Sequence, residues 1–425
     1  MRFSIDVYDH EVVPLLNRLV GITGEGPWLK KFGTLQQQFK ENAFLRDWMV
    51  ERHGVELKFA ELLVREAREG RFPVELQDRL QYELFAFAAG VVRIYDRLSA
   101  PGQNRLRGML LDGLKPDNNL LSLQHEVLTC VHLVSRGYDV EPNDIENGSG
   151  VDFIARLDGL ELEVECKMFT GDLGRKLVRR KVLMLDHHLR STVERVFNSA
   201  TRGIIVRITV PDRLSCAPGQ LLAIDTALSS ALLKGQMVTK SEECEIEVKD
   251  FDVANSPFHL RGKEHPTYDA VEDFVHSKFG KHNVNLMIFY TPGKRAVVVL
   301  VESAKADEVL KGVHRQLREA AKKQFTKIRP GVLSAQFQEL TAEQMVNLGN
   351  SDSSRGGTPT GLQIMTSYFL NNPNRNHIHT VAYRSHGTLI RDPQGHIRES
   401  GVSYYIRNPV NPYADDPRAK VFANV

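Results

Sequence analysis

Two carboxylates and a lysine stand in the middle of the chain, at positions that a hairpin can bring side by side. Asp152 lies in the segment VDFIARL, whereas Glu165 and Lys167 lie in LELEVECKMF. Carboxylate oxygens on adjacent strands form the kind of hard-oxygen site that suits Mg²⁺. A lysine two residues from the second carboxylate shares its face of the strand and can act on a water molecule or a phosphate. This combination suits metal-assisted hydrolysis of a phosphodiester.

The dipeptide Asp158-Gly159 joins the two segments and is a strong hairpin signal. If it forms a two-residue loop, Leu157 pairs with Leu160, and Asp152 falls directly opposite Glu165. Alternation of side chains then gives the hairpin an apolar face, expected to be core, and a polar face. The apolar face carries Phe153, Ala155, Leu162, Val164, Cys166 and Met168. The polar face carries Asp152, Ile154, Arg156, Glu161, Glu163, Glu165 and Lys167.

A solvated outer face would explain the polar side of the hairpin without any function. Like charges directly opposite each other on a ladder, however, cost a few tenths to about 1 kcal/mol. A divalent cation between Asp152 and Glu165 removes that repulsion, so we favour a metal site.

The spacing of Asp152, Glu165 and Lys167 resembles the signature of the PD-(D/E)XK, or restriction-endonuclease-like, nuclease superfamily. The expected context is similar too: a helix over 119–136, a short strand, the hairpin, and then a further helix and strand. The resemblance covers about residues 119–210. A valine precedes Asp152 where the family name has proline.

The resemblance implies a role for each residue of the motif. Asp152 and Glu165 would bind Mg²⁺, or Mn²⁺ in its place, with help from the main-chain carbonyl of Cys166. Lys167 would position or activate the attacking water. Members of the superfamily often have a glutamate in the preceding helix, and Glu126 matches that place; a glutamate on a helix surface is the alternative.

A cluster of cations follows the motif, within a helix expected over 172–197. It consists of Arg175, Lys176, Arg179, Arg180 and Lys181, with no acid in the stretch to offset it. Pairs four residues apart would share one face of that helix. We interpret the cluster as a contact for the phosphate backbone of nucleic acid, against the alternative of a solvated helix face.

The order of expected elements predicts an α/β fold: a restriction-endonuclease-like mixed sheet flanked by helices, with a helical N-terminal domain. A chain of 425 residues suggests two or three domains. We expect a helical domain over 1–117, a nuclease-like α/β domain over 118–347, and a β-rich C-terminal extension over 348–425 that could belong to the same sheet.

Composition gives no further direction. The formal net charge is +2, so any case for a nucleic-acid partner depends on local clusters. The four cysteines are widely separated and form no CxxC pair, which suits reduced thiols. The N-terminus does not read as a signal peptide and no run is long and apolar enough for a membrane span, so we expect a cytoplasmic protein without a membrane partner.

The sequence therefore predicts a Mg²⁺-dependent endonuclease or exonuclease, acting on DNA rather than RNA. The resemblance implies repair, recombination or defence as its role, and the N-terminal helices could support a homodimer or bind a protein partner. A catalytically inactive nuclease-fold protein that binds nucleic acid or supports an assembly is the main alternative. The third hypothesis is a purely structural interaction protein, with the polar face of the hairpin in solvent.

Overall fold

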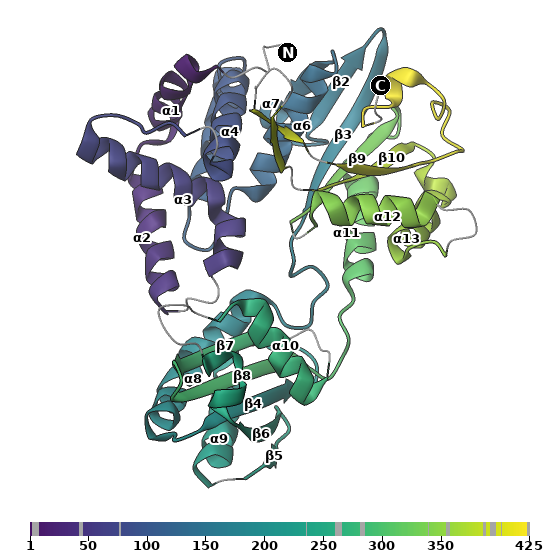
Figure 1. Cartoon of the computed structure of the whole chain (residues 1–425). Coiled ribbons are helices and arrows are strands. Elements are labelled where there is room, and N and C mark those ends of the chain that lie inside the picture. Colours follow the sequence, from purple (N-terminus) through teal and green to yellow (C-terminus); the bar gives the residue numbers. More distant parts are fainter. Residues whose placement is uncertain are drawn as a thin grey trace. The chain divides into compact units, whose positions relative to one another are not determined.

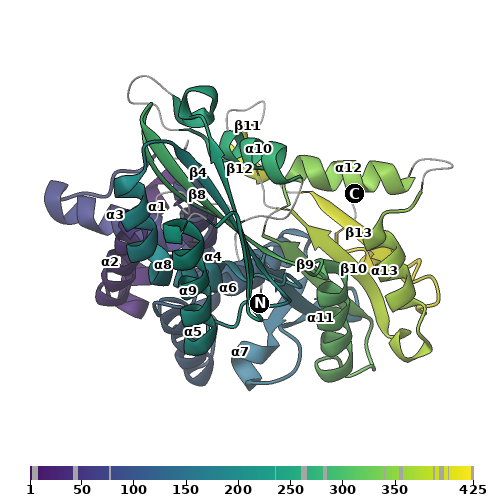
Figure 2. The ribbon, with the colours of Figure 1, turned by 90° about the horizontal axis from the view of Figure 1, so that it is seen from below.

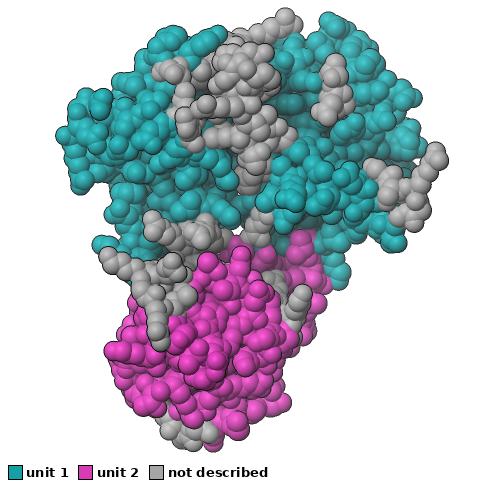
Figure 3. All heavy atoms as spheres, viewed as in Figure 1, with its two compact units in different colours: residues 1–173, 310–425 teal, residues 174–309 magenta. Residues whose placement is uncertain are grey.

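The computed structural model describes the chain except for residues 2–7, 42–45, 76–77, 235, 260–265, 281–284, 339, 354–357, 386–387, 392–396, 401 and 423–425. The chain forms two compact units (Figure 3). Unit 1 consists of residues 1–173 and 310–425, and unit 2 consists of residues 174–309. This division differs from the boundaries expected at 117 and 347. The N-terminal helices share one hydrophobic core with the first sheet, which is why no break falls between them.

Unit 1 begins with consecutive helices, in agreement with the helix-forming composition of the first 115 residues. They are α1 (Asp9–Thr23), α2 (Gly26–Glu41), α3 (Arg46–Glu69), α4 (Arg79–Tyr95) and α5 (Ala100–Gly113). Two of them begin at side-chain caps, since Asp78 accepts the Gln81 N–H and Ser99 accepts the Gly102 N–H. Helix α6 (Leu121–Ser135) follows and leads into the sheet.

A six-stranded mixed sheet forms the centre of unit 1, in the order β1-β2-β3-β9-β10-β13. Its strands are β1 (Asp139–Pro142), β2 (Phe153–Leu157), β3 (Leu160–Phe169), β9 (Gly331–Phe337), β10 (Ile378–Arg384) and β13 (Ser403–Arg407). Strand β9 is parallel to both β3 and β10, while the other neighbours are antiparallel. The C-terminal segment thus contributes β10 and β13 to this sheet.

The hairpin of β2 and β3 has the register that its turn predicts. Leu157 pairs with Leu160, and Phe153 pairs with Val164. Asp158 and Gly159 have φ angles of +47° and +81°, so both turn residues are in the left-handed region, as in a type I′ turn.

Both faces of the unit 1 sheet are covered, which corrects the expectation of one core face and one polar face. Phe153, Val164 and Cys166 pack in the core formed with α1–α6. Ile154 and Phe169 pack in a second core on the opposite face. The helices α11 (Val309–Lys323) and α13 (Gly361–Leu370) contribute to that second core, together with Met345 of α12 (Ala342–Ser353); Figure 1 and Figure 2 show all three near β9 and β10.

Shorter elements complete unit 1. They are α7 (Asn143–Asn147), the 3₁₀ turns η4 (Pro373–Arg375) and η5 (Pro417–Ala419), and a separate two-stranded ribbon of β11 (Thr388–Arg391) and β12 (Ile397–Ser400).

Unit 2 has its own five-stranded sheet, in the order β5-β6-β4-β8-β7. The strands are β4 (Gly203–Val210), β5 (Val238–Lys240), β6 (Glu245–Phe251), β7 (Asn285–Thr291) and β8 (Arg295–Ser303). Helices α8 (Arg179–Ser199) and α9 (Pro218–Lys234) pack on one face, and α10 (Tyr268–Phe279) packs on the other with η2 (Val253–Asn255) and η3 (Pro257–His259).

This sheet corrects one expectation of the sequence. The strand at 203–210 was expected to continue the nuclease-like sheet, but β4 pairs with β6 and β8 of unit 2. The helix expected from residue 172 begins at Arg179 and also belongs to unit 2. Among the described residues, no helix combines the length and apolar character needed to cross a membrane.

Candidate active site

Asp152 directly precedes β2, where the hairpin register places it across from Glu165. Its Oδ2 accepts a hydrogen bond from the backbone N–H of Cys166 at 2.6 Å. The Asp152 carboxylate is therefore fixed against β3 by the main chain, independently of any side-chain partner. This contact supports the predicted proximity of the two carboxylates.

Glu165 lies within β3 and is only 1 % exposed. One of its oxygens, Oε1, forms an ion pair with the ammonium group of Lys167. The other oxygen, Oε2, is buried and has no hydrogen-bond partner among the described residues. A buried polar atom without a partner lowers the free energy of unfolding by about 1–3 kcal/mol. This unused acceptor therefore destabilises the fold, which indicates a role other than stability. A solvated outer face is thereby excluded for Glu165.

Glu126 projects from α6, which packs on the sheet through Leu123, Val127 and Cys130. Its side chain is half-buried and also lines a surface depression of about 610 Å³. Arg52, Asn118 and Ser122 are among the other residues of that depression. Glu126 thus lines a concave part of the unit 1 surface and is close enough to Asp152 and Glu165 for their charges to act on it.

The start of α6 is held by buried charged residues of the N-terminal helices. The Glu56 carboxylate, 2 % exposed, accepts the Leu120 N–H at 3.0 Å and lies 3.3 Å from His53 Nδ1. Lys31 Nζ donates to three successive parts of the loop before α6, the carbonyls of Lys115, Pro116 and Asn118, at 2.7–3.0 Å. These contacts fix the helix that carries Glu126. No local sequence signal connects them, because they join segments about 64–87 residues apart.

The electrostatics of the site all favour the uptake of positive charge. Burial, reinforced by Asp152, raises the pKa of Glu165 to about 8. Burial also raises the pKa of Asp152 to about 6, although the Cys166 N–H opposes the shift. Burial and the two neighbouring carboxylates raise the pKa of Glu126. Burial opposes the charge of Lys167, yet the Glu165 carboxylate outweighs it and raises the pKa of Lys167. Three carboxyl groups share one ammonium, so a proton or a cation relieves the excess negative charge.

The residues of the site fit a metal ion in part. Within the described part of the chain, no group of three or more His, Cys, Asp or Glu side chains is arranged to hold one. Asp152 and Glu165 lie close enough for the charge of Asp152 to act on Glu165, and the unpartnered oxygen of Glu165 suits a hard cation. The Cys166 thiol packs in the core and burial raises its pKa, so only the main chain of Cys166 is suited to join them.

The cationic cluster expected beside the site lies in unit 2. Lys176 is only 9 % exposed, and its ammonium group lies 3.3 Å from both Asp212 and Glu308. Arg175 and Lys176 precede α8, whereas Arg179, Arg180 and Lys181 form its first turn. The five cations therefore do not share one helix face, and acids distant in sequence offset at least one of them.

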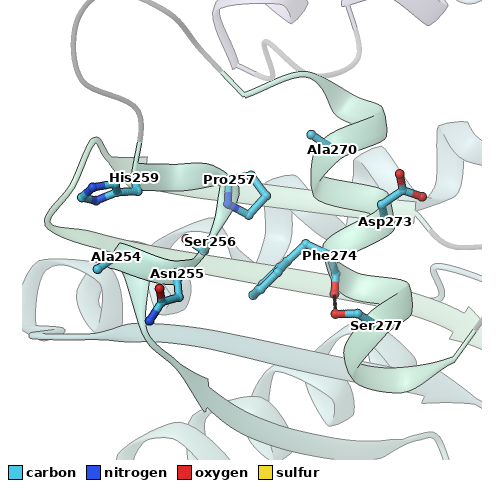
Figure 4. A pocket seen from close by; sticks show the side chains of 9 residues that line it. All are labelled: Ala254, Asn255, Ser256, Pro257, His259, Ala270, Asp273, Phe274 and Ser277. Atoms are coloured by element: carbon cyan, nitrogen blue, oxygen red, sulfur yellow. Dashed lines mark hydrogen bonds between the residues drawn. The ribbon is translucent and has the colours of Figure 1, made fainter.

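A second depression, of about 710 Å³, lies in unit 2 between α10 and the η2–η3 segment (Figure 4). Its polar side chains include His259 and Asp273, both exposed. The Ser277 hydroxyl donates to the carbonyl of Phe274 on its own helix at 2.6 Å, as the dashed line in Figure 4 shows. The described lining offers no activated nucleophile and no converging carboxylates, so we place the candidate chemistry in unit 1.

Comparison with known proteins gave no relative: no family model, no curated protein and no solved structure matches this chain.

Proposed function

We propose that this protein is a Mg²⁺-dependent nuclease that hydrolyses phosphodiester bonds, with DNA as its substrate. The observation that carries the proposal is the unpartnered Oε2 of the buried Glu165, beside Asp152 and Lys167 on one hairpin. Nothing in the folding of the sheet requires an unsatisfied carboxylate oxygen there. A residue that binds a cation, by contrast, needs a carboxylate oxygen that is not already hydrogen-bonded.

The order of elements in unit 1 supports the same proposal. Apart from the short helix α7 between β1 and β2, the order is α6, β1, β2, β3, α11 and β9 when unit 2 is left aside. Strand β9 lies parallel to β3, next to the strand that carries Glu165 and Lys167. This succession is the one that the resemblance to the PD-(D/E)XK superfamily implies, with unit 2 as an insertion between β3 and α11.

The chain's own residues would divide the chemistry as follows. Asp152 and Glu165 would hold Mg²⁺, together with the main-chain carbonyl of Cys166. When bound, Mg²⁺ supplies a Lewis acid for phosphodiester hydrolysis. Lys167 keeps its proton beside Glu165 and can donate hydrogen bonds to a phosphate oxygen or to the attacking water. Glu126 adds a third carboxyl group at the edge of the site.

The first prediction concerns cleavage. Plasmid and single-stranded DNA are incubated with the protein in Mg²⁺, in Mn²⁺ and in EDTA. We expect cleavage that EDTA abolishes, and a loss of at least about 100-fold in rate for Asp152→Ala, Glu165→Gln and Lys167→Ala. Glu161→Gln is the matched control, because Glu161 lies on the same strand but is engaged by Arg156 and Arg329 away from the motif.

A binding measurement separates the metal site from the reaction. Calorimetric titration of wild type with Mn²⁺ should show binding that Glu165→Gln weakens and Glu161→Gln preserves. Equal cleavage by wild type and the three site variants would show that the site is wrongly assigned. DNA retention without cleavage or metal binding would instead support an inactive nucleic-acid-binding protein.

A further inference from the structure

Helix α11 carries a continuous stripe of cations on the surface of unit 1. Lys311, Arg315, Arg318 and Lys322 follow one another at intervals of four, three and four residues, so they line one face. All four are exposed, while Val313, Leu317, Ala320 and Ala321 pack in the core on the opposite side. We call these four residues the α11 stripe. From Lys311 to Lys322 it extends about 16 Å along the helix axis.

The stripe has little opposing charge. Within the part of the chain that the structure describes, the side chains of Arg315, Arg318 and Lys322 form no ion pair and no hydrogen bond. Glu319 is the acid that shares the helix with them. It lies four residues after Arg315 and three before Lys322, so it is the one acid of α11 that can offset the four cations of the stripe.

Helix α13 adds an exposed aromatic ring, and the η4 turn that follows it adds a further cation. The Arg375 guanidinium lies 4.2 Å from the ring centre of Phe369 and donates to the Phe369 carbonyl at 2.6 Å. Burial lowers the pKa of Arg375, and the nearby charge of Arg318 lowers it further. Tyr368, 74 % exposed, lies beside His314 of α11 with the two ring centres 6.2 Å apart. The four cations of the stripe and Arg375 therefore outnumber the one acid of α11, next to a ring that offers a stacking surface.

The position of α11 in unit 1 relates the stripe to the candidate site. Thr326, just after the helix, donates its N–H to Glu163 near the start of β3. The helix then leads into β9, which runs parallel to β3. The helix is about 22 Å long and packs on the sheet. Its last residues lie near the start of β3, so its first residues lie toward the C-terminal end of β3, beyond Lys167.

We propose that the α11 stripe, together with Tyr368, binds the phosphate backbone of duplex DNA. The four cations match the negative charge of a strand that advances about 3.4 Å per phosphate along the duplex axis, so the stripe can reach several successive phosphates. Contacts of this kind give affinity and register without reading base sequence. The biological role of this binding surface rests on the proposed nuclease function, but DNA binding can be measured without cleavage.

The test measures binding of a 30-base-pair DNA duplex to the full-length protein in EDTA, over a range of salt concentrations. The double variant Arg315→Ala/Arg318→Ala should bind about 10- to 100-fold more weakly at low salt, and its salt slope should fall by about 2. Lys30→Ala/Lys40→Ala, which removes two exposed cations from α2, should stay within about twofold of wild type. Glu319→Gln should bind more tightly than wild type.

Equal binding by wild type and the α11 variant, or an equal loss in the α2 control, would overturn the inference. Tighter, stripe-dependent binding of an RNA duplex would overturn the assignment to DNA. A small phosphodiester such as thymidine 5′-p-nitrophenyl phosphate distinguishes the two proposals, because the α11 variant should hydrolyse it like wild type. If wild type fails to hydrolyse this ester and DNA, while the stripe variant still loses DNA binding, the nuclease proposal fails and the binding surface stands.

Discussion

Two glutamates on β3, separated by one residue, are equally buried but differ in what surrounds them. Glu163 is 0 % exposed, and its carboxylate accepts hydrogen bonds from the backbone N–H and the hydroxyl of Thr326. It also forms an ion pair with Arg329. Glu165 has only Lys167, and one oxygen has no partner among the described residues. The first carboxylate holds the connection from α11 to β9 in place. The second is left available, which is typical of a functional residue.

This contrast gives a prediction about stability in the absence of metal. Glu163→Gln should lower the free energy of unfolding by about 2 kcal/mol, because an amide cannot accept all the donors that face it. Glu165→Gln should change it by less than about 1 kcal/mol or increase it, because burial and Asp152 disfavour the charged form of Glu165, which glutamine cannot adopt. Urea denaturation in EDTA measures both values.

The outcome that counts against this view is a large loss of stability in Glu165→Gln together with a small one in Glu163→Gln. Glu165 would then be the structural residue of the pair.

The hairpin was predictable from the sequence because the residues that determine it are adjacent in the chain. Two residues with positive φ set the turn, the turn sets the register, and the register places Asp152 against β3. The strand that completes the sheet was not predictable in this way. Nothing local distinguishes the sequence of β4, which joins another sheet, from that of β9, which pairs with β3 after an intervening unit. The burial of the polar face follows from the same long-range pairing and was missed for the same reason.

The contact between α6 and the C-terminal segment should depend on pH through His132. Its ring stacks on Phe422 with 5.1 Å between centres, and Nε2 donates to the Val421 carbonyl at 3.1 Å. Burial, with Arg384 and Arg136 nearby, lowers the pKa of His132 to about 4. The unfolded chain, with an ordinary histidine pKa near 6.5, therefore binds more protons between these values.

The contribution of His132 to the free energy of unfolding is therefore fully present above about pH 6.5. It is lost as the pH falls toward 4, by at most about 3 kcal/mol. His132→Gln should flatten that part of the profile. The measurement is the free energy of unfolding of wild type and variant between pH 7.5 and 4.5. Parallel profiles for the two proteins would show that His132 does not titrate as its surroundings indicate.

Unit 2 is inserted in the chain of unit 1, between residues 173 and 310. The chain segments at its two ends are bound to each other: the Glu308 N–H donates to the Gly174 carbonyl at 2.9 Å, and the Lys176 N–H donates to Asp307 at 2.8 Å. Gly174 has a φ of +74°, and a Cβ there would lie 2.5 Å from the Glu308 carbonyl oxygen, so this position requires glycine. The unit also has a core on each face of its own sheet.

Each unit should therefore fold without the other. Replacing residues 175–308 with a short glycine–serine linker should leave unit 1 with a cooperative thermal transition, and the fragment 174–309 should show one of its own. Calorimetry of the full chain should show both transitions. A replacement variant that has native helix content but no cooperative transition would show that unit 1 depends on the insertion.

The insertion between β3 and β9 has a consequence for how the protein is made. Residues 170–330 must leave the ribosome after β3 and before its parallel neighbour exists, which takes roughly 10 to 30 seconds at about 5–20 residues per second. During that interval β3 is an open edge strand, the form in which nascent chains aggregate. Glu163, Glu165 and Lys167 place charges along that edge. The same side chains that we assign to structure and catalysis in the finished protein would also keep the nascent strand from pairing with a wrong partner.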